Sequence, residues 1–189
     1  MRRGILFAIS GPSGCGKGTV VAKVRKMDPT IGYSVSCTTR KPRVGEEEGV
    51  HYYFVTHEQF DEMVATGEIV EWDEFCGNKY GTPKTPLIKA VEEGKDVMLD
   101  ITIPGTMRLK ELLPNDTTTV FLMPPSEEEL ERRLRKRETE TEEQILARLA
   151  ASINEMKQAD RFEYTVINAG LEECADEIFK ILEERRKNA

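Results

Sequence analysis

Residues 11–20 read GPSGCGKGTV and match the pattern G-x-x-x-x-G-K of a phosphate-binding loop. That pattern ordinarily continues with Ser or Thr, whose hydroxyl binds Mg²⁺. Here Gly18 takes this position, and the hydroxyl comes one residue later, at Thr19. The stretch therefore raises the question of which phosphate chemistry tolerates the change.

The segments on either side of the loop predict a strand and a helix. The apolar run ILFAI at 5–9 is typical of a buried parallel strand. TVVAKVRKM at 19–27 has its valines at helical spacing, and a Pro follows at Pro29. Backbone N–H groups in such a loop can curl around a phosphate, and Lys17 can reach it from the helix N-terminus. A ligand-free glycine turn is the alternative, and the strand–loop–helix order favours nucleotide binding. The predicted nucleotide-binding residues are Gly11, Pro12, Ser13, Gly14, Cys15, Gly16, Lys17, Gly18 and Thr19.

Composition sets the class of protein and its partners. The chain has 189 residues, of which 39% are hydrophobic and 32% charged, as expected of a soluble α/β domain with small excursions. Its formal net charge of −7 opposes binding to a polyanion, so we expect no nucleic-acid partner. An anionic ligand must instead be held by locally concentrated Arg and Lys.

The cysteines and the apolar stretches bear on compartment. The chain has four cysteines without a C-x-x-C pair and only two histidines, which argues against a zinc site and for reduced thiols. The apolar run near the N-terminus is too short for a signal peptide, and no stretch approaches the about 18 apolar residues of a membrane span. We expect a cytoplasmic protein with no membrane partner.

The rest of the chain alternates between helical and strand patterns. Helices are predicted at 83–95, 105–113, 126–138, from 141, and from 171, and buried strands at 96–101, 118–123 and 164–168. This alternation predicts a three-layer α/β/α fold around a parallel sheet with right-handed crossovers. Residues 34–84 differ in composition and predict a small α+β insertion. It contains a helix at 56–67 with a capping box of Thr56 and Gln59, followed by a strand at 68–72.

Phosphate-binding loops serve several kinds of enzyme. A GTPase would need N-K-x-D, and the nearest match, NKYG at 78–81, lacks the Asp. A motor would need a much larger chain. Phosphoryl transfer between two substrates tolerates Gly18 best, because phosphates and water can then coordinate the metal.

The insertion carries a second group of candidate binding residues. Arg40 and Arg43 lie three residues apart with hydroxyls nearby, and two such arginines can grip a phosphate monoester. Glu71 could accept the N1–H and 2-amino group of guanine side by side, and Thr82 could donate to O6. The alternative is a polar surface loop with scattered ion pairs.

A third stretch, ERRLRKRETETEEQILARL at 131–149, is rich in arginine. One interpretation is a solvated helix face, since Glu residues stand four positions before Arg132, Arg133 and Arg135. The other is a lid whose arginines stabilise charge on a transferring phosphoryl group. Composition alone favours the solvated face.

Taken together, these stretches resemble the successive motifs of the guanylate kinase family. GPSGCGKGT, SVSCTTRKPRVGEEEGVHYYF, EIVEWDEFCGNKYGTP, VMLDI and RRLRKRETETEEQILARL occur in that family's order through most of the chain. In this family a loop reading GKG followed by Thr is an accepted form. The resemblance implies ATP and Mg²⁺ as co-substrates and GMP or dGMP as acceptor. It also implies a CORE (1–33, 85–125, 151–189), a GMP-binding domain (34–84) and a LID (126–150).

The resemblance also assigns roles to individual residues. Lys17, Arg40, Arg133, Arg137 and Arg148 would be catalytic. Ser36, Arg40, Arg43, Tyr52, Glu71, Tyr80, Thr82 and Thr102 would bind GMP. Asn168 would lie near the ATP base, and Asp100 would hold the metal, through water. Arg132 and Arg135 would remain surface residues.

Two departures from the family pattern keep alternatives open. The family reads D-x-D-x-x-G where this chain has Asp100 and then Thr102, and R-G-T where it has Glu138 after Arg137. A related kinase with another phosphate-bearing acceptor, or a non-catalytic guanylate-kinase-like binding module, are the competing hypotheses. The sequence leaves open whether the protein is a monomer or a homo-oligomer.

Overall fold

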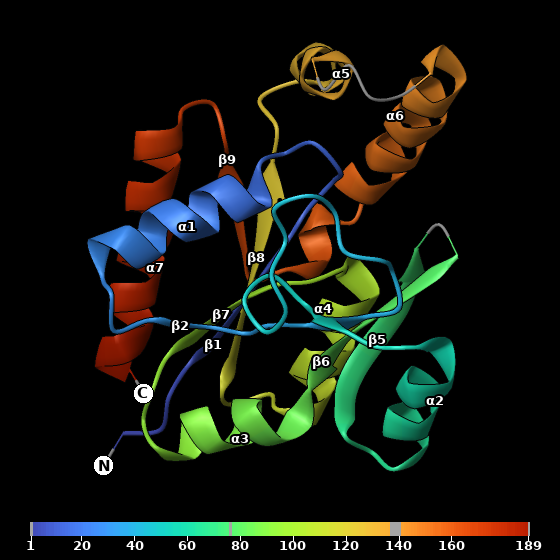
Figure 1. Cartoon of the computed structure of the whole chain (residues 1–189). Helices are drawn as coiled ribbons and strands as arrows, with labels where there is room; N and C mark the ends of the chain where they lie inside the picture. The colour runs from blue at the N-terminus through green and yellow to red at the C-terminus, as the bar shows by residue number, and fades with distance from the viewer. Residues whose placement is uncertain (1, 76, 137–140, 189) are drawn as a thin grey trace.

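The larger sheet forms the centre of the computed structural model, which describes residues 2–75, 77–136 and 141–188 (Figure 1). Among these residues it has five parallel strands in the order β2-β7-β1-β8-β9. Their bounds are β1 (Leu6–Ser10), β2 (Gly32–Tyr33), β7 (Val97–Asp100), β8 (Thr117–Met123) and β9 (Tyr164–Ile167). The predicted strands at 5–9, 96–101, 118–123 and 164–168 are confirmed.

Two features of this sheet differ from the sequence prediction. Strand β2 is too short to give a periodic signal and was not predicted. The predicted buried strand at 164–168 is an edge strand, in which Val166 is buried and Ile167 is 56% exposed. Only one neighbour, β8, pairs with it in the described part of the chain, so one edge of β9 remains open.

Helices cover both faces of this sheet. Helices α1 (Lys17–Met27) and α7 (Leu171–Asn188) pack on one face, and α3 (Lys84–Glu92) and α4 (Ile103–Leu112) on the other (Figure 1). Strand β1 is buried on both sides, since Phe7 and Ile9 belong to the first core and Leu6 and Ala8 to the second. The predicted three-layer α/β/α fold is confirmed.

A smaller sheet lies beside α4, at the lower right of Figure 1. Its strands run in the order β4-β3-β6-β5, where β3 is Cys37–Thr38, β4 Tyr53–Phe54, β5 Ile69–Phe75 and β6 Asn78–Pro83. Helix α2 (His57–Ala65) begins at the predicted capping box of Thr56 and Gln59 and packs Phe60 into a small core. Strand β6 was not predicted, because NKYGTP contains the Gly and Pro of a turn.

Helices α5 (Glu127–Arg135) and α6 (Glu142–Met156) form the third part, and a short 3₁₀ helix, η1 (Ala159–Arg161), follows them. Ser126 caps α5, and Thr141 and Gln144 form the predicted capping box of α6. Leu130 and Leu134 of α5 pack against α6. None of the helices in the part of the chain that the structure describes combines the length and the apolar character of a membrane span.

Buried Asp96 joins both ends of the chain to the sheet. It accepts hydrogen bonds from Arg2 at 2.8 and 3.0 Å, from the Ile5 N–H at 2.9 Å and from Arg186 at 2.7 Å. Burial alone would raise the pKa of Asp96, but these hydrogen bonds outweigh it and the pKa is lowered. The carboxylate therefore stabilises the fold as long as it is ionised.

We expect Asp96→Asn to lower the free energy of unfolding by about 3 kcal/mol, because the buried acceptor loses its charge while Arg2, Arg186 and the Ile5 N–H still point at it. Urea denaturation measures this. Asp116→Asn is the matched control, since Asp116 pairs with the exposed Arg3, and should cost less than about 1 kcal/mol. In the native chain the Asp96 contribution is present above the ordinary pKa of 3.8 and is lost as pH falls through the lowered pKa. Equal losses in both variants would contradict this role.

Candidate active site

The phosphate loop connects β1 to α1, and its glycines are required by its shape. Gly14 and Gly16 have φ of 90° and 93°, a region that favours glycine. A Cβ on Gly16 would also lie 2.7 Å from Nδ2 of Asn168. Lys17 is the first residue of α1, and its ammonium donates to the carbonyl of Gly11 at 2.7 Å. The loop thus has the strand–loop–helix setting that the motif needs.

Two residues assigned to the nucleotide site hold the loop from outside. Asn168, which follows β9, donates through Nδ2 to the Cys15 carbonyl at 2.7 Å. Arg133 of α5 donates to the Asn168 carbonyl at 2.9 Å and to the Cys15 carbonyl at 3.3 Å. Cys15 is itself buried, and burial raises the pKa of its thiol. In this structure Asn168 and Arg133 therefore support the backbone of the loop.

A cleft of about 290 Å³ separates the loop from the smaller sheet. It lies beyond the carboxyl ends of β1 and β7, where parallel α/β sheets bind their ligands. Of the predicted site residues, it is lined by Gly11, Ser13, Lys17, Ser36, Tyr52, Glu71, Tyr80, Asp100 and Thr102. The fold thus brings residues that are more than eighty positions apart in the chain to the walls of the same cleft.

Glu71 is a buried carboxylate at one side of this cleft, only 4% exposed. It lies on β5 opposite Thr82 of β6, whose hydroxyl donates to Oε1 of Glu71 at 2.5 Å. Burial raises the pKa of Glu71, the Thr82 bond opposes this, and nearby Asp73 raises it further. Thr82 was expected to donate to a guanine; here its proton goes to Glu71, so it orients the carboxylate.

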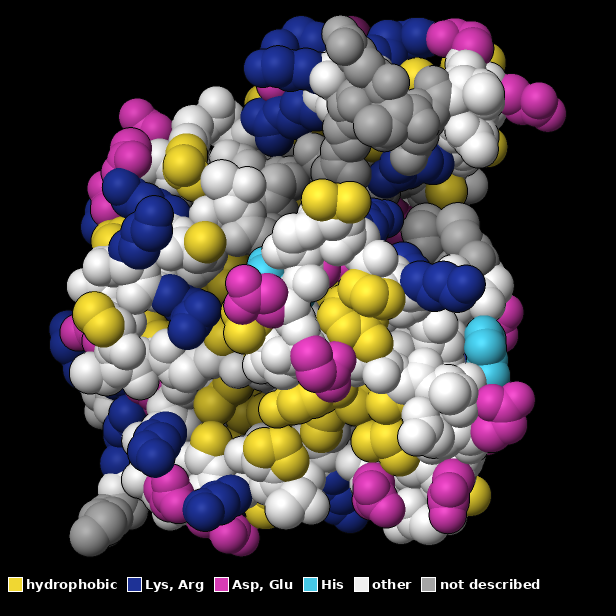
Figure 2. All heavy atoms as spheres, viewed as in Figure 1, with side chains coloured by type: hydrophobic (Ala, Val, Ile, Leu, Met, Phe, Trp, Pro, Cys, Tyr) yellow, Lys and Arg dark blue, Asp and Glu magenta, His cyan; other side chains and the backbone are white. Residues whose placement is uncertain are grey.

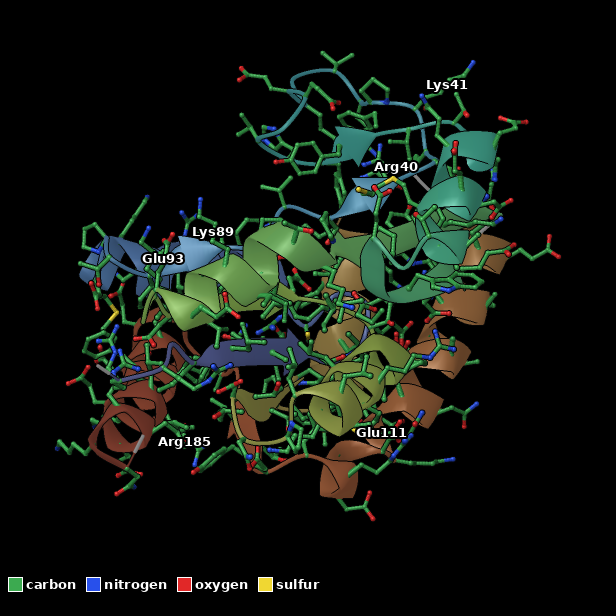
Figure 3. The ribbon with its side chains drawn as sticks, turned by 90° about the horizontal axis from the view of Figure 1, so that it is seen from below. Arg40, Lys41, Lys89, Glu93, Glu111 and Arg185 are labelled. Carbon is green, nitrogen blue, oxygen red and sulfur yellow. The ribbon has the colours of Figure 1, made fainter. Side chains whose placement is uncertain are left out.

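The arginines of the insertion occupy different positions. Arg40 pairs with Glu46 through two bonds of 2.9 Å, and its guanidinium lies 5.4 Å from the ring centre of Tyr52. Figure 3 shows Arg40 close to the smaller sheet and Lys41 farther out. The backbone N–H of Arg43 donates to Glu46 at 2.8 Å, while the Arg43 side chain is exposed. Glu46 therefore ties both arginine positions together, and the Arg40 bond holds the pKa of Glu46 at about 2.

Asp100 is the last residue of β7, Thr102 comes two residues later, and both line the cleft. Burial raises the pKa of Asp100, and the charge of Lys17 opposes this. A Cβ on Gly18 would lie 3.8 Å from Oδ2 of Asp100, an ordinary contact, so position 18 could hold a Cβ beside this carboxylate without a clash. Thr102 caps α4, and its hydroxyl oxygen accepts the Gly105 N–H at 3.2 Å. Thr102, which the resemblance assigns to GMP binding, therefore uses its hydroxyl to cap α4.

Basic side chains gather over α5, at the top of Figure 2. Arg132 and Arg135 are 65% and 40% exposed and pair with glutamates of α5 and α6, in keeping with their expected surface role. Arg133 points instead to the loop, as described above. Arg148 of α6 donates to the hydroxyl of Ser13. The predicted Arg137, and Glu138 beside it, lie outside the residues that the structure describes.

Four further residues belong to the site but were not singled out from the sequence: Glu46, Asp73, Gly105 and Glu155. Asp73 lines the cleft two residues after Glu71 on β5, so the alternation of a strand would have indicated it. Glu155 lines the cleft from α6. Glu155 leaves no local signal, because its place depends on how α6 packs. Gly105 is the glycine of the D-x-D-x-x-G pattern that begins at Asp100, but its approach to Glu71 depends on how separate elements pack.

Comparison with known proteins places the chain in a family. The guanylate kinase family model matches residues 3–185. The chain belongs to the guanylate kinase family. A guanylate kinase of Carboxydothermus hydrogenoformans is 44% identical over 96% of this chain and 89% of its own length. One of Streptomyces coelicolor is 47% identical over 93% of this chain and 89% of its own.

Solved structures agree with this assignment. The crystal structure of guanylate kinase from Anaplasma phagocytophilum matches with a TM-score of 0.81 and 34% identity, over 97% of this chain and 86% of that one. A gluconokinase from Sinorhizobium meliloti matches with a TM-score of 0.55 at 17% identity, which shows a shared fold only.

Gly105 offers a sharp test of the Glu71 site. A Cβ at this position would lie 2.1 Å from Oε2 of Glu71, so Gly105→Ala must displace the carboxylate. We expect the KM for GMP to rise about tenfold or more, as on loss of a charge-assisted hydrogen bond, with the KM for ATP unchanged. Steady-state kinetics with each substrate varied measures both constants. An unchanged KM for GMP in a folded variant would show that Glu71 does not contact this substrate.

Proposed function

We propose that this chain transfers the γ-phosphoryl group of ATP to the phosphate of GMP or dGMP, giving ADP and the diphosphate. One observation carries the proposal: a single cleft is lined both by Lys17 of the phosphate loop and by the buried Glu71, whose carboxylate is held from behind by Thr82. The first feature suits a nucleoside triphosphate. The second suits the two adjacent donors on the edge of guanine and disfavours adenine, which lacks them.

Positioning and charge neutralisation account for the chemistry. The acceptor phosphate is already ionised near neutral pH, so the in-line attack needs no general base. Lys17 and Arg40, with the lid residues Arg133, Arg137 and Arg148, would neutralise the charge that spreads over the transferring group. Ser36, Arg43, Tyr52 and Tyr80 would hold the acceptor phosphate, and closure of the cleft would exclude water.

The residues at the floor of the cleft fit a hydrated Mg²⁺. This ion keeps several waters and is commonly held by one or two carboxylates together with substrate phosphates. Asp100 is such a carboxylate, and it lies close to Lys17 and Gly18. Among the described residues there is no cluster of three or more His, Cys, Asp or Glu that could hold a metal by itself. When bound, Mg²⁺ would supply charge stabilisation on the phosphates, and Asp100 would orient its waters.

We also propose a domain organisation and a cellular setting for this activity. The CORE (1–33, 85–125, 151–189) would carry ATP, the 34–84 segment GMP, and the LID (126–150) would close over both. The smaller sheet falls within 34–84 and α5 within the LID, whereas the proposed boundary at 150 falls inside α6. Cytoplasmic purine nucleotide metabolism, without a nucleic-acid or membrane partner, is the setting that suits this activity.

A nucleotide panel separates the proposal from its competitors. ADP release would be measured with ATP–Mg²⁺ and each of GMP, dGMP, AMP, CMP and UMP. Turnover confined to GMP and dGMP is the expected result. GMP binding without turnover would support a non-catalytic module. Inactivity with all five nucleotides would contradict the proposal and favour a kinase with another phosphate-bearing acceptor.

A further inference from the structure

Asp73 is a second carboxylate beside Glu71 in the cleft. It lies on β5 two residues after Glu71, so both side chains are on the same face of the strand, and both line the cleft. The Glu74 N–H donates to Oδ1 of Asp73 at 2.8 Å. Among the residues that the structure describes, no cation forms an ion pair with Asp73, and its Oδ2 accepts no hydrogen bond. One oxygen of this carboxylate is therefore available to a ligand.

The pairing of β5 with β6, which lie side by side in Figure 1, sets where Asp73 stands along a bound nucleotide. Glu71 lies opposite Thr82, where the guanine is proposed to bind, and Asp73 lies opposite Tyr80. The Tyr80 ring packs edge-on against the Tyr52 ring, with centres 6.0 Å apart, and both tyrosines belong to the group proposed for the acceptor phosphate. Asp73 is about 7 Å along the strand from Glu71, on the side of this group. The sugar joins base to phosphate in a nucleotide, so it occupies this interval.

The chemistry of a carboxylate narrows what Asp73 can contact. An ionised carboxylate only accepts hydrogen bonds, so its partner must be a donor. The ionised phosphate of the acceptor offers no donor, and its negative charge is repelled by a carboxylate. The hydroxyls of ribose are donors, and acidic side chains bind the ribose 2′-hydroxyl in dinucleotide-binding folds. The sugar is therefore the part of the nucleotide that suits Asp73.

The shape of a guanine nucleotide selects the 2′-hydroxyl. In nucleic-acid helices the guanine 2-amino group and the ribose 2′-hydroxyl are both displayed in the minor groove, so they lie on one edge of the nucleotide. A strand face that meets the 2-amino group through Glu71 can then meet the 2′-hydroxyl through the next residue on the same face, which is Asp73. The negative charge of Asp73 also adds to the rise that burial causes in the pKa of Glu71, and a donor bound at Asp73 would offset part of this repulsion.

We propose that Asp73 is a specificity-determining residue that accepts a hydrogen bond from the ribose 2′-hydroxyl of the acceptor nucleotide. This rests on the proposed function, because it assigns the smaller sheet to GMP. Glu71 would read the guanine, which GMP and dGMP share, whereas Asp73 reads the sugar, in which they differ. GMP is then the preferred acceptor, and dGMP, which lacks the 2′-hydroxyl, is the weaker one.

The test measures kcat/KM with GMP and with dGMP for the native chain, Asp73→Ala and Asp73→Asn. We expect the native chain to prefer GMP about tenfold, as for one hydrogen bond to a charged group, and Asp73→Ala to show almost no preference. The loss should fall on GMP, with dGMP within about twofold of its native value. Asp73→Asn keeps an acceptor for the Glu74 N–H and loses only the charge, so its preference should be intermediate. Glu74→Ala is the matched control, because it removes a carboxylate from the exposed neighbouring position, and it should keep the native preference.

Equal losses with GMP and dGMP in Asp73→Ala would overturn the inference, since they indicate a contact with the base or a structural role. Calorimetry of GMP and dGMP binding without ATP separates the inference from the proposed function. A native chain that binds GMP more tightly than dGMP but does not phosphorylate it would contradict the function, while loss of this preference in Asp73→Ala would still support the role of Asp73. A native chain that binds GMP no more tightly than dGMP would overturn that role.

Discussion

Replacing Lys17 with Met should lower kcat for GMP phosphorylation by about 10²–10³-fold. Lys17 begins α1 and sits over the loop, with its ammonium 2.7 Å from the Gly11 carbonyl. From there it can reach the phosphoryl group in transfer, where charge develops. Met retains the aliphatic length of the side chain, so the variant should fold with native stability.

Lys23→Met is the matched control for this prediction. Lys23 lies farther along α1 and pairs with Glu172 on the surface, so its loss removes the same charge from the same helix. We expect its kcat to remain within about twofold of the native value, as is usual for exposed ion pairs. Steady-state kinetics at saturating GMP and ATP measures both variants. Comparable losses in the two would mean that Lys17 acts only through net charge.

Glu71→Gln should lower kcat/KM for GMP by about 10³-fold, because its amide donor would face the donors of guanine in a buried site. A pH profile adds a second readout. Burial raises the pKa of Glu71, and only the ionised carboxylate accepts both guanine donors. In the native chain kcat/KM for GMP should therefore fall as pH drops through this raised pKa. In Glu71→Gln that part of the profile should be flat.

Glu74→Gln provides the control on the same strand. Glu74 is exposed and alternates with Glu71 and Asp73, so it belongs to the opposite face of β5. Its activity and pH profile should match those of the native chain. A Glu71→Gln variant that kept native activity with GMP would remove the basis for guanine recognition at this site.

The central strands of the larger sheet, β1, β7 and β8, could be predicted from sequence because they are buried on both faces. Runs such as ILFAI at 5–9 are apolar without interruption, and each is followed by a helix pattern with recognisable ends. The short strands β2, β3 and β4 have only two residues each and carry no periodicity. Strand β6 was missed because its Gly81 and Pro83 resemble turn residues, although both lie within its pairing to β5.

Only part of the candidate site could be predicted from the sequence. The loop and the paired arginines are local motifs, and the resemblance supplied roles for Glu71 and the lid. Contacts between distant elements had no such signal: Arg148 and Ser152 of α6 bond to Ser13 of the loop, and Gly105 makes room for Glu71. The bond between Arg40 and Glu46 is local, but only the folded loop shows that this carboxylate engages the arginine.

Transfer of a labelled phosphoryl group tests the proposed reaction most directly. The protein would be incubated with Mg²⁺, GMP and ATP labelled at the γ-phosphorus, and the products would be separated by chromatography. We predict that the label appears in GDP in amounts equal to the ADP formed. Label found in inorganic phosphate, or retained in ATP while GMP stays unchanged, would contradict phosphoryl transfer to GMP.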